Sequence, residues 1–141
     1  MNIHVKGLRH INIAIISVVG ALFSSACSLI EGGVRITNFG HSALLVKGAG
    51  RSVLINPFEA VGCAAGLSEP KVNADVILAS SELADEGGQV ANGIFLVKPG
   101  SYRIKGLQIE GFTAPHDRVG GRRFGQATLW RWEQAGLSFA H

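Results

Sequence analysis

The sequence predicts an α/β (α+β) domain that is rich in strands and preceded by an apolar N-terminal helix. Two observations carry this prediction. Beyond residue 33 the chain consists of short apolar runs separated by Gly, Pro and Asn, and only residues 81–90 have the pattern of a helix. The 19 glycines fit the many tight turns that such a chain needs. We therefore expect layered sheet structure and not a closed all-β barrel.

The N-terminal segment has the composition of an export signal. Residues 11–30 contain no charge, two basic residues precede them, and small residues lead to Cys27. A cleaved signal peptide, a signal with lipidation at Cys27, an uncleaved anchor and a core helix all fit this pattern. We expect residues 1–26 to be a signal peptide or membrane anchor, 27–33 a linker and 34–141 an incomplete domain.

The order of charge and apolar sequence predicts export. Because the positive residues precede the apolar run, the rest of the chain is expected outside the cytoplasm. It would then be periplasmic, membrane-anchored or extracellular in a bacterium, and the N-terminal segment is the expected membrane contact. The two cysteines, Cys27 and Cys63, do not make a disulfide framework, and their spacing does not decide whether they pair.

The charge balance argues against a nucleic-acid partner. The isoelectric point is about 9.2, but removing Lys6 and Arg9 with residues 1–26 leaves 11 of the 13 basic side chains against 10 acidic ones. The one local concentration of basic residues lies within 118–131, and no nucleic-acid-binding motif surrounds it. We expect a solvated loop there.

The individual strands are predicted by apolar runs between turn residues. Residues 34–38 alternate, and 43–46 and 52–55 are continuous apolar runs, so the three predict a β-meander. A buried strand is predicted at 76–79 and a short helix within 81–90. Further strands are predicted at 94–97, 102–104, 107–112, 128–133 and 137–140, with the last two joined as a hairpin. Trp130 and Trp132 share one face of their strand and are expected in the core.

Polar residues follow directly after the buried strand in the stretch 74–88, which reads ADVILASSELADEGG. This order delivers side chains to a site at a strand end in α/β proteins. The three acidic residues Glu82, Asp85 and Glu86 are interpreted as an exposed acidic turn or helix start. The alternative is a carboxylate-rich site that uses them with His116 and suits Mg²⁺, Mn²⁺ or Ca²⁺.

Residues 34–141 resemble the N-terminal part of the metallo-β-lactamase superfamily, and within it the ascorbate-6-phosphate-lactonase-like branch of metal-dependent hydrolases. The likeness lies, in order and spacing, in GHS at 40–42, INP at 55–57, the stretch 74–88, TAPHD at 113–117 and GLSFAH at 136–141. It implies a four-layer αββα sandwich with Zn²⁺ or another divalent metal between two sheets. A metal-activated water would there hydrolyse a lactone, ester or phosphoester.

Carried over position by position, the resemblance implies that most metal ligands are missing. The first two histidines of the family's His-x-His-x-Asp-His motif fall on Ser81 and Leu83. The aspartate is kept as Asp85, the last histidine falls on Glu86, which is a candidate substitute, and His116 keeps the third-motif histidine. Leucine cannot coordinate a metal and serine rarely does, so we expect no metal or a weakly bound one.

Four further residues sit on landmarks of the same family. Asn56 stands where the family has the aspartate of Ile-Asp-Pro, and the fourth-motif aspartate is expected two positions past His141, beyond the end of the chain. His41, His116 and His141 are the histidines that remain after residue 26, and a hydrogen-bonded structural role is expected for each. Asp117 either orients His116 or caps a turn.

These residues together predict a metallo-β-lactamase-fold hydrolase relative that is truncated and inactive. Because the family fold has two similar halves, we also expect an inner sheet face left exposed. One alternative is a non-catalytic exported binding or interaction protein, and another is an active hydrolase with an unusual metal site. Whether the chain is an enzyme is left open, and its small-molecule substrate cannot be read from the sequence.

Overall fold

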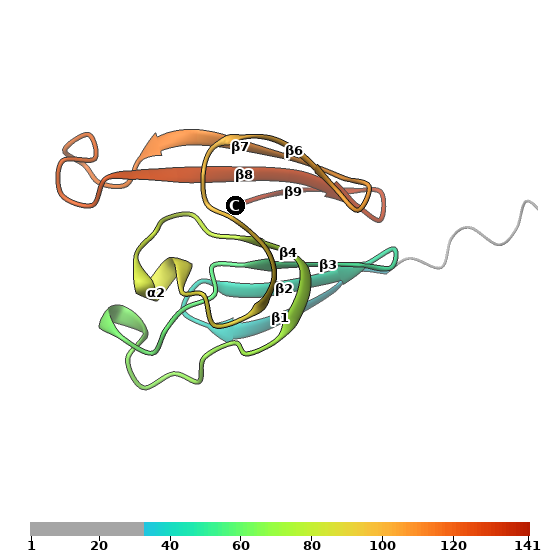
Figure 1. Ribbon diagram of the computed structural model, residues 1–141, viewed down its shortest axis with the longest axis horizontal. Coiled ribbons are helices and arrows are strands. Elements are labelled where there is room, and N and C mark those ends of the chain that lie inside the picture. The colour runs from blue at the N-terminus through green and yellow to red at the C-terminus, as the bar shows by residue number, and fades with distance from the viewer. Residues whose placement is uncertain (1–32) are drawn as a thin grey trace, which may run out of the picture. The chain divides into compact units, whose positions relative to one another are not determined.

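The computed structural model describes residues 33–141, which form two β-sheets packed face to face (Figure 1). The first sheet has the order β1-β2-β3-β4-β5, and its strands are β1 (Arg35–Gly40), β2 (Ala43–Gly48), β3 (Arg51–Ile55), β4 (Asn73–Leu78) and β5 (Asn92–Leu96). Strands β1 to β3 are antiparallel, whereas β4 runs parallel to both β3 and β5. The parallel pairs need crossover connections, which here are loops with short helical turns.

The second sheet is an antiparallel meander. Its strands are β6 (Gly100–Ile104), β7 (Leu107–Pro115), β8 (Gln126–Gln134) and β9 (Leu137–Ala140), paired in chain order. The described helices are the 3-10 turn η1 (Gly62–Ala64) and the four-residue helix α2 (Ala84–Gly87). No helix within residues 33–141 is long and apolar enough to cross a membrane.

The core lies between the inner faces of the two sheets. From the first sheet it takes residues such as Val53 and Leu78, both fully buried, and from the second Ile109, Trp130 and Trp132. The indole Nε1 of Trp130 donates to Ala79 O at 2.9 Å, so its one polar group is satisfied. The predicted exposed inner face is therefore wrong, because β6 to β9 cover it.

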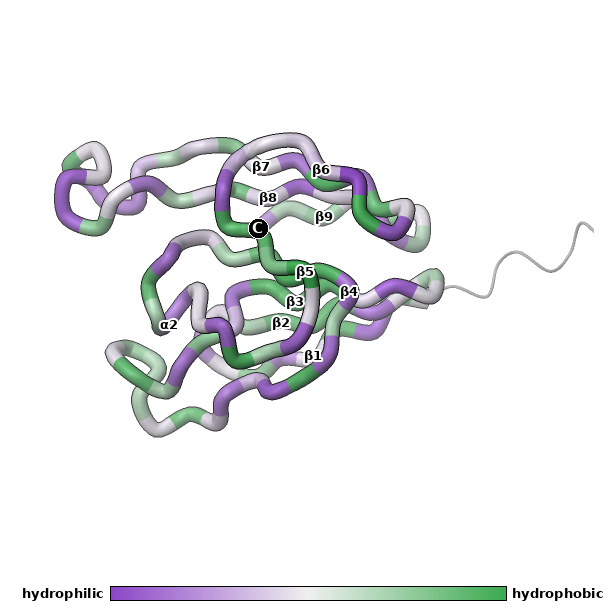
Figure 2. The backbone as a smooth tube through the Cα atoms, in the orientation of Figure 1, coloured by the Kyte–Doolittle hydropathy of each residue, from purple (hydrophilic) through white to green (hydrophobic). Residues whose placement is uncertain are grey.

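A second apolar layer covers the outer face of the first sheet. Leu45, Leu54 and Ile77 are buried there under partly buried side chains of the loops and of β5. Figure 2 shows the hydrophobic segments that run along β3, β4 and β5. Strands with apolar residues on both faces read as continuous apolar runs, which is why 52–55 and 76–79 were recognisable in the sequence.

The predicted strands, the meander and the final hairpin are confirmed, with shifts of a few residues at their ends. The helix predicted within 81–90 shrinks to α2, because Gly87 and Gly88 pack tightly against the backbone. A Cβ on Gly88 would lie 2.5 Å from Glu59 N, and its own N–H donates to Pro57 O. The predictions for residues 1–32, including Cys27 and the apolar helix, lie outside the described residues.

Candidate functional site

The ends of β3, β4, β7 and β9 and the turn between β1 and β2 meet at one end of the sandwich. Asn56, which follows β3, contacts three polar residues from these segments: Ser80 after β4, His141 after β9 and Ser42 in the turn. The sequence predicted Asn56 and His141 as site residues, and the structure brings them together.

Asn56 organises this cluster. It is 3% exposed and has a φ of 42°, in the left-handed region that asparagine tolerates better than most residues. Its Oδ1 accepts from Ser80 N at 2.7 Å. Its Nδ2 therefore faces Ser80 Oγ at 2.9 Å, His141 Nε2 at 3.1 Å and Ser42 Oγ at 3.3 Å. The amide acts as the donor of the cluster.

His141 is held as a neutral base. Its backbone N and O pair with Trp130 at 2.9 and 2.8 Å, which extends β9 by one residue. Burial lowers the pKa of its imidazole, and the charge of Glu86 only partly opposes this. Since the Asn56 amide donates, the unprotonated Nε2 of His141 accepts. The predicted hydrogen-bonded structural role fits this geometry.

A second group of polar contacts joins the loop after β4 to the loop after β7. The carboxylate Oε2 of Glu86 accepts from Ser81 Oγ at 3.1 Å and lies 2.9 Å from His116 Nε2. Ser81 is buried, and its Oγ also accepts from Leu83 N at 3.3 Å. The other ring nitrogen, His116 Nδ1, is buried and has no partner within the described residues. Glu86 and His116 thus contact each other directly, through Oε2 and Nε2.

The remaining predicted residues point elsewhere. Asp85 lies in the first turn of α2, as the helix-start interpretation predicted, and its Oδ2 accepts from Cys63 N at 3.2 Å. His41 is exposed and packs edge-on against Phe58 with ring centroids 6.1 Å apart. Glu82 is exposed. None of these side chains joins His116.

Asp117 caps a turn and does not orient the imidazole of His116. Its two carboxylate oxygens accept from the backbone N–H groups of residues 119, 121, 123 and 124 at 2.7 to 3.0 Å. Partial burial acts to raise the pKa of Asp117, but these four donors outweigh it and lower the pKa to about 2. The loop between β7 and β8 is thus closed around a charged aspartate.

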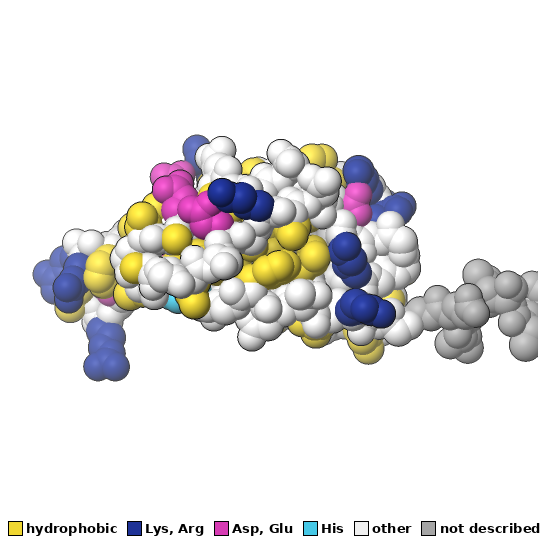
Figure 3. Space-filling view, turned by 90° about the horizontal axis from the view of Figure 1, so that it is seen from below, with side chains coloured by type: hydrophobic (Ala, Val, Ile, Leu, Met, Phe, Trp, Pro, Cys, Tyr) yellow, Lys and Arg dark blue, Asp and Glu magenta, His cyan; other side chains and the backbone are white. Residues whose placement is uncertain are grey.

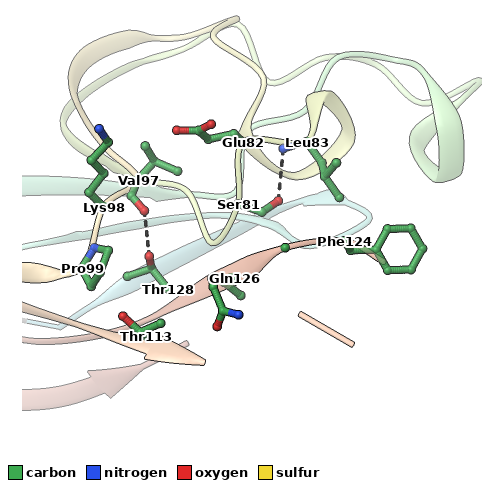
Figure 4. A pocket seen from close by; sticks show the side chains of 12 residues that line it. Ser81, Glu82, Leu83, Val97, Lys98, Pro99, Thr113, Phe124, Gln126 and Thr128 are labelled. Atoms are coloured by element: carbon green, nitrogen blue, oxygen red, sulfur yellow. Dashed lines mark hydrogen bonds between the residues drawn. The ribbon is translucent and has the colours of Figure 1, made fainter. Parts of the chain in front are cut away.

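An open cleft of about 510 Å³ lies beside the two groups. Figure 4 shows Leu83, Val97, Pro99 and Phe124 around it, together with Ser81, Thr113, Gln126 and Thr128. The Thr128 hydroxyl donates to Val97 O at 2.7 Å, which ties the wall of the cleft to the second sheet. A few polar groups in a largely apolar wall are typical of small-molecule sites.

Two packed sheets with polar residues at one set of strand ends fit the fold that the family resemblance implies. The family model for the beta-lactamase superfamily domain matches residues 35–141, so the chain belongs to this superfamily. The predicted fold class is thereby confirmed, whereas the lactonase-like branch stays a prediction. A search of curated proteins gives no match.

Two solved structures are similar to the chain. One, from Thermotoga maritima, is classed as a Zn-dependent hydrolase of the metallo-β-lactamase superfamily, with 25% identity and a TM-score of 0.58 over 77% of this chain and 48% of that one. The other, classed as a metal-dependent hydrolase from Parabacteroides distasonis, has 17% identity and a TM-score of 0.55 over 77% and 60%, and shares the fold alone. The chain thus spans about half the length of the first.

The residues present do not fit a bound zinc ion. Of the two ligands that the family resemblance retains, Asp85 is directed to the backbone of Cys63 and His116 to Glu86. Within residues 33–141, no three His, Cys, Asp or Glu side chains gather in a way that could hold a metal. Zinc sites need three or four such donors. The carboxylate-rich site of Glu82, Asp85, Glu86 and His116 is not assembled.

Sequence reasoning missed Ser42 and Ser80 as members of the cluster. Each follows a residue or segment that was recognised, the glycine-histidine pair at 40–41 and the strand at 76–79. The available signal was their position immediately at a strand end or turn, where short polar side chains face the site. Their hydroxyls complete the hydrogen bonds of Asn56.

Proposed function

We propose that this chain is a metallo-β-lactamase-fold protein that does not catalyse metal-dependent hydrolysis. The contact of 2.9 Å between Glu86 Oε2 and His116 Nε2 carries the proposal. In the family a histidine would stand in place of Glu86, and both would bind metal. Here the carboxylate and the imidazole are committed to each other, and Ser81 completes the arrangement from a third ligand position.

The chemistry left at the site supports the same conclusion. A metal would lower the pKa of a bound water towards neutrality and so supply hydroxide at physiological pH. The described residues offer a neutral imidazole, His141, whose Nε2 is already bonded to Asn56. The Nε2 atom of His141 is therefore not free to replace the metal as the activator of water.

The metal content of the purified full chain tests the proposal. After equilibration with Zn²⁺ and buffer exchange, elemental analysis is expected to find far less than one ion per chain. A variant with Ser81→His, Leu83→His and Glu86→His restores the three ligand positions and is expected to retain more zinc. The matched control Ser81→Ala, Leu83→Ala and Glu86→Ala should retain none. Near-stoichiometric zinc in the wild type would overturn the proposal.

Hydrolysis assays give a second test. The full chain is expected not to turn over simple lactones, esters or phosphoesters above the rate of buffer, with Zn²⁺, Mn²⁺ or Mg²⁺ added. Turnover that a chelator abolishes and the metal restores would contradict the proposal. The identity of any small-molecule substrate is a separate prediction that these assays address.

Ligand binding without turnover is a second candidate function, favoured by the cleft of about 510 Å³. The fluorescence of an apolar anionic dye, anilinonaphthalene sulfonate, tests it on the full chain. Phe124→Ala removes a side chain of the cleft and is expected to weaken binding. Phe112→Ala, on an exposed side chain that does not line the cleft, is the matched control. Equal effects of the two variants, or no saturable binding, would contradict it.

Export, lipidation at Cys27 and truncation stay predictions. The DNA downstream of the codon for His141 tests truncation, since a continuation with a Leu-Gly-Asp-like motif, in frame or frameshifted, would establish it. Mass spectrometry of the chain from a membrane fraction tests cleavage and lipidation at residue 27. The expected absence of a nucleic-acid partner is also untested.

A further inference from the structure

The end of the sandwich opposite the site carries a row of basic residues. Arg35 of β1 lies directly across from Lys47 of β2, which lies across from Ser52 of β3. Arg51 of β3 pairs with Gly48 one position further along. Side chains that face each other on antiparallel strands are about 5 Å apart at Cβ. Arg35 and Lys47 therefore share one face of the first sheet, whereas Arg51, the residue before Ser52, starts from the opposite face. All three cations are exposed and line one hollow at the same end of this sheet.

This basic row borders a shallow hollow of about 460 Å³ whose one carboxylate is already neutralised. Asp75 accepts from Lys105 Nζ at 2.6 Å and from Ser52 N and Oγ at 2.8 and 3.0 Å. The Lys105 hydrogen bond, followed by the Ser52 backbone, lowers the pKa of Asp75 to about 2. Asp75 and Lys105 thus cancel, and the ion pairs of residues 33–141 include none with Arg35, Lys47 or Arg51.

Arg35 and Lys47 are like charges on facing strands, which destabilises a sheet in isolation. An anionic partner removes that cost. Figure 3 shows Lys and Arg side chains at both ends of the domain. The second basic set, in the loop between β7 and β8, contains Arg118, Arg122 and Arg123 and lies next to the site.

The chain enters the described domain beside the basic row. The position of a Cβ on Gly48 would lie 3.1 Å from Val34 Cγ2 and 3.6 Å from Gly33 O, so the first described residues run along the end of β2. The sequence that precedes Gly33 has an uncharged apolar run at 11–30 and one acidic residue, Glu31. An apolar run joined to a cationic surface is the arrangement that anionic membranes attract.

We propose that the end of the first sheet that carries Arg35, Lys47 and Arg51 rests on an anionic phospholipid surface. The apolar run supplies attachment to the bilayer, and the basic row orients the domain with the site pointing away from it. The proposal rests on the predicted membrane contact of the N-terminal segment and is independent of whether the site hydrolyses anything. Each basic side chain near such a surface strengthens binding by about fivefold.

Vesicle co-sedimentation of the full chain tests this face. Vesicles of phosphatidylcholine alone measure the contribution of the apolar run, and vesicles with added phosphatidylglycerol measure the added effect of charge. The wild type is expected to prefer the anionic vesicles at low salt and to lose that preference as NaCl is raised. Absence of any preference at low salt would overturn the proposal.

Two variants with equal charge change locate the effect. Arg35→Gln/Lys47→Gln/Arg51→Gln is expected to lose on the order of 100-fold of the preference, from about fivefold for each of three charges. Arg118→Gln/Arg122→Gln/Arg123→Gln is expected to keep it. Since the Arg51 side chain also donates to Lys105 O, Arg35→Gln/Lys47→Gln provides a variant that leaves this bond intact, with a loss of roughly 25-fold expected. Equal losses in both triple variants, or a loss confined to binding of duplex DNA, would overturn the proposal.

Discussion

The core between the two sheets and the site at the strand ends differ in how far their residues match what the family resemblance implies. The core keeps the apolar residues that a sandwich requires, and all nine of its buried members are at most 5% exposed. The site differs, because the side chains at its ligand positions contact one another. Core stability comes from burial of apolar area, at about 25 cal/mol per Å², and needs no ligand residue. The stability of the core therefore does not depend on which residues occupy the ligand positions of the family.

The largest expected effect is a break of the core at Trp130. Trp130→Ala removes a fully buried indole and its hydrogen bond to Ala79 O, so unfolding should become about 3–5 kcal/mol easier. Urea denaturation followed by circular dichroism measures this change. Leu129→Ala, at the neighbouring residue on the opposite, exposed face of β8, should cost less than about 1 kcal/mol. Similar costs for both would contradict the described core.

Asn56→Asp tests whether the site cluster depends on an amide donor. A carboxylate cannot donate to His141 Nε2 or keep the present bond to Ser80 Oγ, so a loss of about 1–3 kcal/mol is expected near neutral pH. Asn38→Asp is the matched control. Asn38 uses its Oδ1 to accept from Gly40 N, which a carboxylate does equally well, so little change is expected there. The cluster is misassigned if the two variants behave alike in denaturant.

The lowered pKa of His141 predicts a pH dependence of stability. The unfolded imidazole has a pKa near 6.5, so below that pH the unfolded chain binds a proton that the folded chain resists. The stability contributed by neutral His141 is present above this value and is lost as the pH falls below it. Denaturation at a series of pH values should show this loss in the wild type and a smaller one in His141→Gln. If His141→Gln leaves the dependence of the unfolding free energy on pH unchanged, the neutral state of His141 in the folded chain is contradicted.

Ser81→Ala has the smallest expected effect. It removes one hydrogen bond to Glu86 and one from Leu83 N, both inside a loop, and should cost about 0.5–1.5 kcal/mol. The exposed Ser138 of β9 offers the control, since Ser138→Ala should be neutral within about 0.5 kcal/mol. Unfolding free energies of the two variants check the difference. A neutral Ser81→Ala would show that Glu86 and His116 hold the loop without it.

The strands were predictable because their signals are local. The apolar runs at 52–55 and 76–79 and the turn at 134–136 each specify structure within a few residues. The helix at 81–90 was overestimated because its limit is set by contacts of Gly88 with Glu59 and Pro57, some thirty residues earlier. Local pattern carries no information about such contacts.

The sequence predicted which residues belong to the site better than it predicted which of them contact one another. The family motifs marked Asn56, Glu86, His116 and His141, but nothing in the sequence indicated that Glu86 would bond His116 while Asp85 turned to Cys63. The basic row was missed for a related reason. The sequence showed only the arginines within 118–131 as a local concentration, whereas Arg35 and Lys47 become neighbours through strand register.

The left-handed backbone of Asn56 narrows what this position can hold. At a φ of 42° a β-branched or bulky residue would be strained, whereas asparagine, aspartate and glycine are accommodated. Of these three, only asparagine both fits the turn and supplies an amide. Asparagine in place of aspartate at this position therefore replaces a negative charge with an amide hydrogen-bond donor. The path of the backbone stays unchanged. The backbone conformation of this turn therefore permits a change in the charge of the site without a change in the shape of the site.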